Sequence, residues 1–282
     1  MIARGLAFIE REREWGGLWR YYSSKNFKHL RVPPDLDDTC VAAFALHLGG
    51  RGRPANRATI LGNRDAAGRF GTWIVRTPTT PLQVRFVRWV GELIARRKTP
   101  PAPPDVRGNP RFAEPTDQVA VDEIDPVVNA NVVAYLGDGP ETAAATAYLR
   151  SLAGRGLTAS SHYYSNPLSL AYAMARAIDA GVTSLAPTLS DVVATVRGHL
   201  DVGENALTPL TAGLGVVAHC TLAPPDAVIA RAVHFLLESQ QADGSWRREV
   251  FYNGPKEFWG SEELTTAMAL EALARYRTRV ET

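Results

Sequence analysis

Two kinds of apolar segment alternate along this chain. One kind is rich in alanine, leucine and other small residues and carries almost no charge, as helices do when they are buried all round. These segments span residues 37–48, 126–136, 167–178, 207–220 and 262–275. The other kind has apolar residues three and four apart and charge on the opposite face, a pattern typical of surface helices. These segments span 82–97, 140–152, 188–200 and 225–239, and residues 4–13 show the same pattern.

The low-charge segments recur at a regular interval. Their internal starting points, Asp125, Asn166 and Asn205, are spaced by about 40 residues, a period that indicates helical-hairpin repeats. Strand patterns are nearly absent apart from the short stretch 71–76. Buried helices paired with amphipathic ones favour an inner ring wrapped by an outer ring over an open solenoid, which needs polar caps at both ends. The sequence therefore predicts an all-α fold, an (α/α) toroid or barrel of inner and outer helices.

Length and composition limit the organisation and the partners. The 282 residues suffice for one large domain, and helix pairs continue on both sides of a proline-rich loop at 99–124, so a single domain over 1–282 is predicted. A net charge of +2 does not favour nucleic acid. No apolar run reaches the roughly 18 residues that span a bilayer, and the start lacks a signal-peptide pattern, so we expect a cytoplasmic protein.

An acidic stretch at one helix start carries the chemistry. Residues 33–39 read PPDLDDT, and the apolar run from Cys40 follows at once. Proline and aspartate are both favoured at the beginning of a helix. Asp35, Asp37 and Asp38 nevertheless lie too close for all three to ionise easily away from water, so one of them is expected to keep its proton. A protonated carboxyl group in an apolar cavity is a strong acid for a weakly basic substrate.

Capping residues and aromatic loops gather before the low-charge segments. Each segment opens at a residue that can cap a helix: Asp35, Asp125, Asn166, Asn205 and Ser261. In a closed ring these ends would meet at one mouth. The loops there are rich in aromatic side chains, which would wall an apolar cavity: Trp15, Trp19, Tyr21, Tyr22, Tyr163, Tyr164, Phe251, Tyr252, Phe258 and Trp259.

Residues 231–246, RAVHFLLESQQADGSW, resemble the QW repeat of squalene–hopene cyclases and related terpenoid cyclases. In such a repeat a glutamine amide can cap a neighbouring helix while the tryptophan packs over a turn that glycine permits. Residues 63–70, NRDAAGRF, look like a degraded copy. This resemblance implies a terpenoid cyclase or prenyltransferase-like toroid, and it concerns the fold rather than the chemistry.

The acidic stretch resembles the Asp-x-Asp-Asp-Thr motif of class II terpene cyclases. That resemblance implies an enzyme of isoprenoid biosynthesis, an isomerase or intramolecular lyase, in which Asp37 protonates a terminal alkene or epoxide while Asp35 and Asp38 hold it. The acid itself would need no cofactor, and Mg²⁺ would matter only for a substrate that carries a diphosphate. His162 is the candidate partner for the carbonyl oxygen of Asp37, with Asn129, Asn131 and Asn166 as others. We expect the substrate to contact Trp15, Trp19, Tyr21, Tyr22, Asn131, Tyr163, Tyr164, Phe258 and Trp259.

Class II sites in larger members of that family lie between two helical domains, and this chain is long enough for one toroid. The second wall would come from loops such as 14–34 and 99–124, or from a partner or second copy that completes the site. A peripheral membrane contact stays open. Six basic residues near the mouth could bind an anionic head group: Arg20, Lys25, Lys28, Arg51, Arg53 and Arg57.

Two other functions fit the same fold. Protein prenyltransferase β subunits are toroids that hold zinc with Asp, Cys and His, and Asp38 and Cys40 offer an Asp-x-Cys pair, although no histidine lies in a recognisable ligand motif. A non-catalytic toroid that binds an isoprenoid or a protein is the second alternative.

Overall fold

The computed structural model describes residues 2–27, 29, 32–74, 123–157, 161–202, 206–253 and 258–281. The chain forms two compact units, Met1–Leu136 and Gly137–Thr282, which are described separately below. Several sequence predictions lie outside the described residues: the outer helix at 82–97, nearly all of the proline-rich loop at 99–124, Lys28 and Asn205. The single domain over 1–282 stays a prediction.

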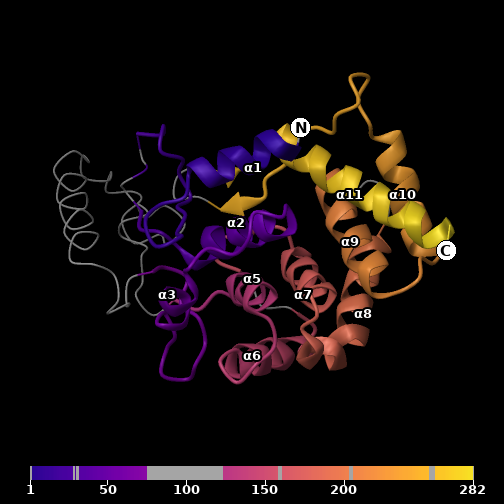
Figure 1. Cartoon of the computed structure of the whole chain (residues 1–282). Coiled ribbons are helices and arrows are strands. Elements are labelled where there is room, and N and C mark those ends of the chain that lie inside the picture. Colours follow the sequence, from indigo (N-terminus) through magenta and orange to yellow (C-terminus); the bar gives the residue numbers. More distant parts are fainter. Residues whose placement is uncertain are drawn as a thin grey trace, which may run out of the picture. The chain divides into compact units, whose positions relative to one another are not determined.

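The first unit is built around two packed helices. Its helices are α1 (Ile2–Arg11), α2 (Leu36–Leu48), α3 (Arg57–Leu61) and α5 (Pro126–Leu136). Helix α2 packs on α5 and also contacts α1 (Figure 1). Ten of the eleven residues of α5 are buried, as its uncharged sequence PVVNANVVAYL predicts. In contrast, α1 buries none of its residues, as expected for an outer amphipathic helix.

The second unit is helical apart from one small hairpin. Its elements are α6 (Ala143–Ala153), α7 (Ser169–Asp179), the 3₁₀ helix η3 (Thr183–Thr188), α8 (Leu189–Leu200), α9 (Pro209–Leu222), α10 (Ala227–Glu238), strands β1 (Tyr252–Asn253) and β2 (Phe258–Trp259), and α11 (Glu262–Glu281). The two strands pair antiparallel, with Tyr252 opposite Trp259. The predicted helices are therefore present with small shifts at their ends, while η3 and the hairpin were not predicted.

Helix α9 is the central helix of this unit and contacts α7, α8, α10 and α11 (Figure 1). Eleven of its fourteen residues are buried. A side chain on Gly213 would place its Cβ only 3.2–3.3 Å from backbone atoms of Met268 and Ala269, so this glycine allows α11 to approach closely. The uncharged, small-residue sequence of α9 thus produces a helix surrounded by its neighbours.

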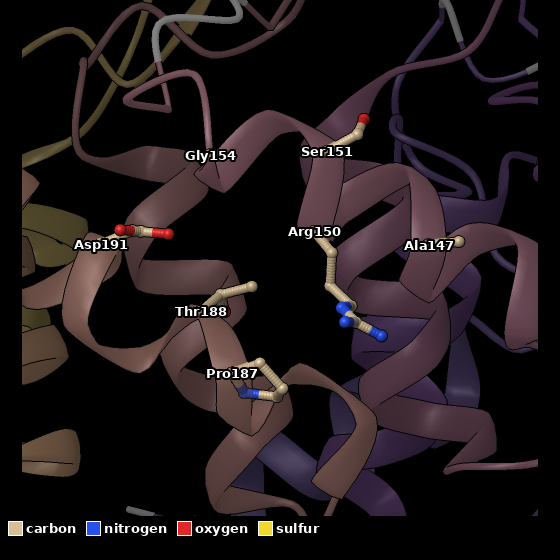
Figure 2. Close-up of a pocket in the computed structure, with 7 residues that line it drawn as sticks. All are labelled: Ala147, Arg150, Ser151, Gly154, Pro187, Thr188 and Asp191. Carbon is tan, nitrogen blue, oxygen red and sulfur yellow. The ribbon is translucent and has the colours of Figure 1, made fainter.

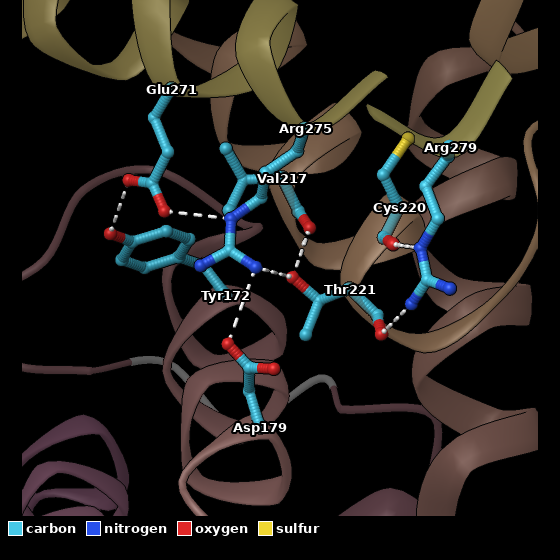
Figure 3. Close-up of polar contacts among 8 residues, drawn as sticks. All are labelled: Tyr172, Asp179, Val217, Cys220, Thr221, Glu271, Arg275 and Arg279. Carbon is cyan, nitrogen blue, oxygen red and sulfur yellow. Dashed lines mark hydrogen bonds and ion pairs between the residues drawn. The ribbon is translucent and has the colours of Figure 1, made fainter. Parts of the chain in front are cut away.

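Helix α2 buries five of its thirteen residues rather than being buried all round, and helix α11 also differs from the sequence prediction. It was expected to be buried all round, but its buried residues are Thr265, Ala269 and Ala272, which form one narrow stripe. The reason is charge, because Glu271, Arg275 and Arg279 on the same helix form polar contacts with α7 and α9 (Figure 3). Helix α11 is therefore buried along one side only, and it is not an inner helix.

Two loops close with the same turn. Asp65 N–H donates to Arg69 O at 2.8 Å and Gly68 N–H to Asp65 O at 3.0 Å; Gln241 N–H donates to Ser245 O and Gly244 N–H to Gln241 O, both at 2.9 Å. Both glycines have positive φ, +80° and +87°, which side chains rarely adopt. The next aromatic residue, Phe70 or Trp246, is fully buried. Residues 63–70 and 241–246 thus share a local structure.

The caps of the helices mostly follow the prediction. Asp125 accepts hydrogen bonds from Val127 and Val128 at the start of α5, and Ser261 accepts one from Leu264 at the start of α11. For α9 the capping residue is Thr208, which accepts from the N–H of Thr211, whereas Asn205 lies outside the described residues. Within the described part of the chain, no helix combines the length and apolar character needed to cross a membrane.

Candidate active site at the start of helix α2

The acidic stretch is held by backbone pairing with a distant segment. Leu36 N–H donates to Thr72 O at 2.8 Å, Ile74 N–H donates to Pro34 O at 3.0 Å, and Asp35 forms a bridge with Trp73. The prolines before Asp35 cannot donate, so their carbonyls and the first helical amides make these contacts. Local propensity starts the helix here, and residues 72–74 fix the position of its first turn.

A loop from residue 14 to 22 lies against the same turn. Trp19 is 4% exposed; its amide donates to Thr39 Oγ1 at 3.1 Å, its carbonyl accepts from Asp35 at 3.3 Å, and its indole donates to Ile9 O at 2.8 Å. Gly17 makes the loop possible, since its φ is +72° and a Cβ there would lie 2.7 Å from Pro54. Trp19 thus has a structural part in placing the acidic residues.

Asp35 and Asp38 lie at the same turn, where Asp35 is buried and Asp38 is partly buried. Asp35 is 4% exposed, and its Oδ1 accepts the backbone N–H of Asp38 at 2.7 Å, which caps α2. Burial, followed by the charge of Asp38, raises the pKa of Asp35 well above its usual value. Burial also raises the pKa of Asp38, although the neighbouring side chain of Asp35 opposes that change.

Asp37 has a different partner. It is partly buried, and its Oδ1 accepts a hydrogen bond of 2.7 Å from Asn131 Nδ2. Asn131 lies on α5, is 6% exposed, and keeps its own Oδ1 buried without a hydrogen-bond partner. Among the four partners considered from the sequence, Asn131 makes this contact, while Asn129 binds the backbone of Phe70 and Asn166 binds Thr211.

The aromatic residues of the first unit divide into different environments. Tyr21 and Tyr22 meet edge to face with ring centroids 4.9 Å apart, and Tyr22 is buried. Tyr21 is 38% exposed, and partial burial, followed by Tyr22 and the negative charges of Asp38 and Asp35, raises the pKa of its phenol. Trp15 is 66% exposed. Tyr21 therefore lies near the acidic turn in addition to Trp19 and Trp73, and Trp15 is a surface residue.

The remaining predicted site residues lie in the second unit. Tyr164 packs against Phe251 and Tyr252 with centroids 5.2 and 5.1 Å away, and Asn253 N–H donates to Tyr163 O at 2.7 Å. The two aromatic loops predicted to meet therefore do meet. His162 is exposed and packs edge to face on Tyr163. Its role toward Asp37 stays a prediction, as do those of Phe258 and Trp259 in β2.

Three of the four arginines of the predicted anion site bind protein groups. Arg20 is held by Glu14 and by the carbonyl of Val32. Arg51 pairs with Glu10 at 3.3 Å, and Arg53 donates to Tyr135 O at 2.8 Å. These guanidinium groups bind protein acceptors, which explains their positions without a ligand. Lys28 is outside the described residues, and Lys25 is exposed.

The arrangement of possible metal ligands gives little support to the zinc-dependent prenyltransferase-like function. Within the described ranges, no three His, Cys, Asp or Glu side chains are grouped so that they could hold a metal ion. Cys40 is fully buried, and burial together with the charges of Asp37 and Asp35 raises the pKa of its thiol well above the usual value. A thiolate ligand is disfavoured in that environment.

A separate groove of about 420 Å³ lies in the second unit between α6 and the start of α8 (Figure 2). Its lining residues are Ala147, Arg150, Ser151, Gly154, Pro187, Thr188 and Asp191. None of the site residues predicted from the sequence lines this groove, so it does not belong to the candidate active site.

Sequence reasoning missed the segment that supports the acidic turn. Residues 72–74 pair with residues 34–36, and Asn63 Nδ2 donates to Gly71 O and Trp73 O, both at 2.9 Å. A local sequence pattern cannot predict this contact, because the two segments are nearly forty residues apart. The strand-like pattern at 71–76 was the one available signal, and in residues 71–74 it corresponds to this isolated pairing.

Comparisons with known proteins relate the fold to terpene cyclases. No protein family matches the sequence, and no curated protein matches it. The structure is similar to a protein from Actinoplanes, with a TM-score of 0.69 and 17% identity over 98% of this chain and 83% of that one. It is similar to the type II terpene cyclase MstE from Scytonema, with a TM-score of 0.66 and 17% identity over 99% of this chain and 82% of that one.

A third similar structure is ent-copalyl diphosphate synthase from Streptomyces platensis, with a TM-score of 0.66 and 15% identity over 98% of this chain and 46% of that one. MstE has been seen with geranylgeranyl dihydroxybenzoate as substrate and with merosterolic acid A as product. At these identities the likeness concerns the fold. It confirms the predicted fold class, an all-α fold of the terpene cyclase toroid type.

Proposed function

We propose that this protein is a class II terpene cyclase-like enzyme in which Asp37 protonates an isoprenoid and starts a carbocation cyclisation. One observation carries the proposal: in a fold of the terpene cyclase type, three carboxyl groups begin a helix, and the middle one accepts a hydrogen bond from Asn131 on a buried neighbouring helix. General acid catalysis needs a proton donor that is both oriented and sheltered from water.

The contact from Asn131 supports the acid role of Asp37. Its Nδ2–H group donates to Oδ1 of Asp37, so the proton of the neutral acid would reside on Oδ2. The positive end of α2 favours an ionised carboxyl group and opposes this role. Neighbouring carboxyl groups work in the other direction, because further negative charge at the same turn is unfavourable.

Tyr21 and Tyr22 are the aromatic groups of the first unit suited to a cationic intermediate. An aromatic face stabilises a nearby cation by about 0.5–2 kcal/mol, and it offers no nucleophile that would end the reaction early. Tyr163, Tyr164, Phe258 and Trp259 of the second unit remain part of the proposed substrate contacts. His162 remains a proposed partner of the acid.

The names of the similar proteins suggest which candidate substrates to test. Geranylgeranyl dihydroxybenzoate is the substrate of MstE, and the third similar protein is a synthase of ent-copalyl diphosphate. We propose an isoprenoid chain, with or without a diphosphate head group, as the substrate class. Purified protein would be incubated with geranyl, farnesyl and geranylgeranyl diphosphates and with geranylgeranyl dihydroxybenzoate, and the products would be resolved by mass spectrometry. Absence of a cyclised product from all of them would contradict the proposal.

Asp37→Asn tests the assignment of the acid. This change keeps the size of the side chain and removes its proton, so turnover should fall by about a thousandfold or more. The matched control is Asp201→Asn, because Asp201 is exposed and pairs with Arg231 on the surface. The control should retain wild-type turnover. Equal activity of Asp37→Asn and wild type would place the acid elsewhere.

Metal dependence separates the cyclase from the zinc alternative. If the proposal is right, a chelator will leave turnover of geranylgeranyl dihydroxybenzoate unchanged, while Mg²⁺ will affect only substrates with a diphosphate. Metal analysis of the purified protein provides the second readout. One tightly bound zinc ion per chain, lost in Cys40→Ala, would favour the prenyltransferase-like function instead. A non-catalytic binding protein would bind these compounds without converting them.

A further inference from the structure

Exposed aromatic side chains gather in one stretch of the first unit. Among the side chains that the structure describes, the exposed phenylalanine, tyrosine and tryptophan residues all lie in the first 27 positions: Phe8, Trp15, Tyr21 and Phe27. Phe27 is 81% exposed, and Ile2 adds an aliphatic group that is 80% exposed. Single exposed apolar residues are normal on a protein surface, but a group of them marks a surface that binds a partner.

Helix α1 contributes two of these residues, because α2 covers only part of its apolar side. Ile2, Leu6 and Ile9 have the spacing of four and three that places them on one face of the helix. Leu6 packs against Gly49 at the end of α2, where a Cβ would lie 2.4 Å from its Cδ1. Even so, no residue of α1 is buried. The helix therefore keeps apolar surface that the described part of the chain does not cover.

The loop that follows α1 is tied to the end of that helix. Ser24 N–H donates to Glu12 Oε2 at 2.6 Å, and the indole of Trp19 donates to Ile9 O at 2.8 Å. The exposed residues of the helix and those of the loop thus belong to one part of the molecule, residues 2–27, which we call the N-terminal surface.

The N-terminal surface carries an excess of positive charge. All three of its glutamates form ion pairs with arginines: Glu10 with Arg51, Glu12 with Arg11, and Glu14 with Arg20. In contrast, the exposed cations Arg4, Arg13 and Lys25 form no ion pair with any described residue. The negative charges of this surface are therefore compensated within the protein, while three positive charges stay available beside the exposed aromatic residues.

We propose that the N-terminal surface binds an anionic lipid membrane, with Phe8, Trp15 and Phe27 inserted at the level of the head groups. Exposed aromatic residues together with unpaired lysine and arginine are typical of segments that lie in the membrane interface. Anionic lipids attract such cations, whereas lysine is depleted at protein–protein interfaces, so the charge favours a lipid over a protein partner. This inference goes beyond the proposed function and does not depend on it.

Sedimentation with vesicles tests the proposal without any measurement of turnover. The full chain would be mixed with vesicles of phosphatidylcholine alone, or of equal parts of phosphatidylcholine and phosphatidylserine, and the bound fraction would be measured at rising salt concentration. We expect binding to the anionic vesicles that weakens as salt screens the charges, and little binding to the neutral ones. No binding to either kind of vesicle, or equal binding to both, would overturn the proposal.

A triple variant tests the cations: Arg4→Gln, Arg13→Gln and Lys25→Gln. Each basic residue near an anionic membrane contributes about fivefold to the binding constant, so this variant should bind about a hundredfold more weakly. The matched control removes the same charge from three exposed arginines of the second unit: Arg150→Gln, Arg247→Gln and Arg277→Gln. The control should bind like wild type. Equal losses in the two variants would show that binding follows net charge and would overturn the proposal.

Fluorescence tests the insertion of the aromatic residues. Lipids with bromine on their acyl chains quench a tryptophan that enters the bilayer, so vesicle binding should quench the wild type, and Trp15→Phe should lose part of this quenching. Phe27→Ser should weaken vesicle binding by about tenfold, because a large apolar group no longer leaves water. Quenching that is unchanged in Trp15→Phe would overturn the proposed insertion.

Light scattering tests the other possible occupant, a second copy of the chain. We expect the molar mass in solution to be the same for wild type and Phe27→Ser. A dimer that Phe27→Ser separates, together with no vesicle binding by the wild type, would assign the N-terminal surface to a protein interface and overturn the proposal.

Discussion

Asp35 occupies the N-cap position of α2, where its carboxyl group is buried beside a second carboxyl group. Aspartate and asparagine cap helices about equally well, because either side-chain oxygen can accept the first amide of the helix. What distinguishes them here is charge. A buried carboxyl group without a cationic partner lowers the stability of the folded state when it ionises. Asp35 therefore lowers the stability of the folded state at any pH where it is ionised, whereas an asparagine at this position would not.

The pH dependence of stability should reveal this effect. Since the pKa of Asp35 is raised in the folded state, the folded chain holds a proton that the unfolded chain releases above about pH 3.9. The contribution of this group to the free energy of unfolding therefore falls as pH rises from that value through the folded pKa. Asp35→Asn should unfold with at least about 1 kcal/mol more free energy than wild type at pH 8, since one pKa unit corresponds to about 1.4 kcal/mol.

Chemical denaturation at several pH values measures this difference. The difference in the free energy of unfolding between Asp35→Asn and wild type should shrink as the pH falls toward 4. At that pH Asp35 of the wild type is protonated, and the asparagine of the variant is neutral at every pH. Asp201→Asn again serves as the control with an exposed carboxyl group. A variant that is less stable than wild type at pH 8 would show that the carboxylate form is the stabilised one.

The sequence was enough to predict which residues are the acids, but it was not enough to predict which residue hydrogen-bonds to Asp37. The sequence identified the three aspartates from their spacing and the helix that follows them. It offered four possible partners for Asp37, and only the packing of α2 on α5 brings Asn131 to it. Nothing in the local sequence distinguishes Asn131 from Asn129, two positions away, because both lie on a helix that is buried on every side.

At the scale of elements, Trp246 connects helices α10 and α11 through two hydrogen bonds. Its indole N–H donates to Leu236 O at 2.8 Å in the last turn of α10, and its amide donates to Thr266 Oγ1 of α11 at 3.0 Å. Gln241 reaches Ser245 Oγ and Glu262 Oε1 from the same turn. The tryptophan thus satisfies a terminal carbonyl of one helix and orients the next.

Two substitutions should separate these contributions. Trp246→Phe keeps most of the buried ring and loses the bond to Leu236, so the free energy of unfolding should fall by about 1–2 kcal/mol. Trp246→Ala also leaves a large cavity and should cost about 3–5 kcal/mol. Thermal or chemical unfolding of the purified variants measures both. Equal losses for the two variants would mean that the hydrogen bond, and not the buried ring, dominates.

Element boundaries were predictable where local signals agree. The starts of α2, α5 and α11 follow their capping residues, and the low-charge composition of α5 and α9 matches their burial. Helix α2 was one exception, since it buries only five of its thirteen residues. Helix α11 was another, since its first half resembles a buried helix while its charged second half binds acceptors on other helices. Those acceptors belong to α7 and α9 and are invisible to a pattern within α11.

At the scale of the molecule, polar contacts join segments far apart in the sequence. In the second unit Arg275 contacts Glu271 at 2.9 Å, Thr221 Oγ1 at 3.0 Å and Asp179 at 3.3 Å, and Glu271 accepts from Tyr172 (Figure 3). Arg279 donates to the carbonyls of Cys220 and Thr221 at the end of α9. Positive charge at helix C-termini is favourable, so α11 is held where α7 and α9 end.

A double-mutant cycle should measure this network. Arg275→Met leaves Glu271 and Asp179 without their cation, and Glu271→Gln weakens the same contact from the other side. Each single change should lower the free energy of unfolding by about 1–2 kcal/mol, after allowing for the partial exposure of both side chains. The double variant should lose less than the sum, because the pair is shared. Strict additivity would show that the two residues act independently.

The sequence by itself determined the class of fold, the alternation of buried and surface helices, and the position of three carboxyl groups at a helix start. These features follow from composition, periodicity and capping, which act between residues a few positions apart. Tertiary structure alone decided that Asn131 binds Asp37, that Asp35 is buried, and that residues 72–74 support their turn. Such contacts join residues brought together by packing, and their burial sets the protonation that the proposed chemistry needs.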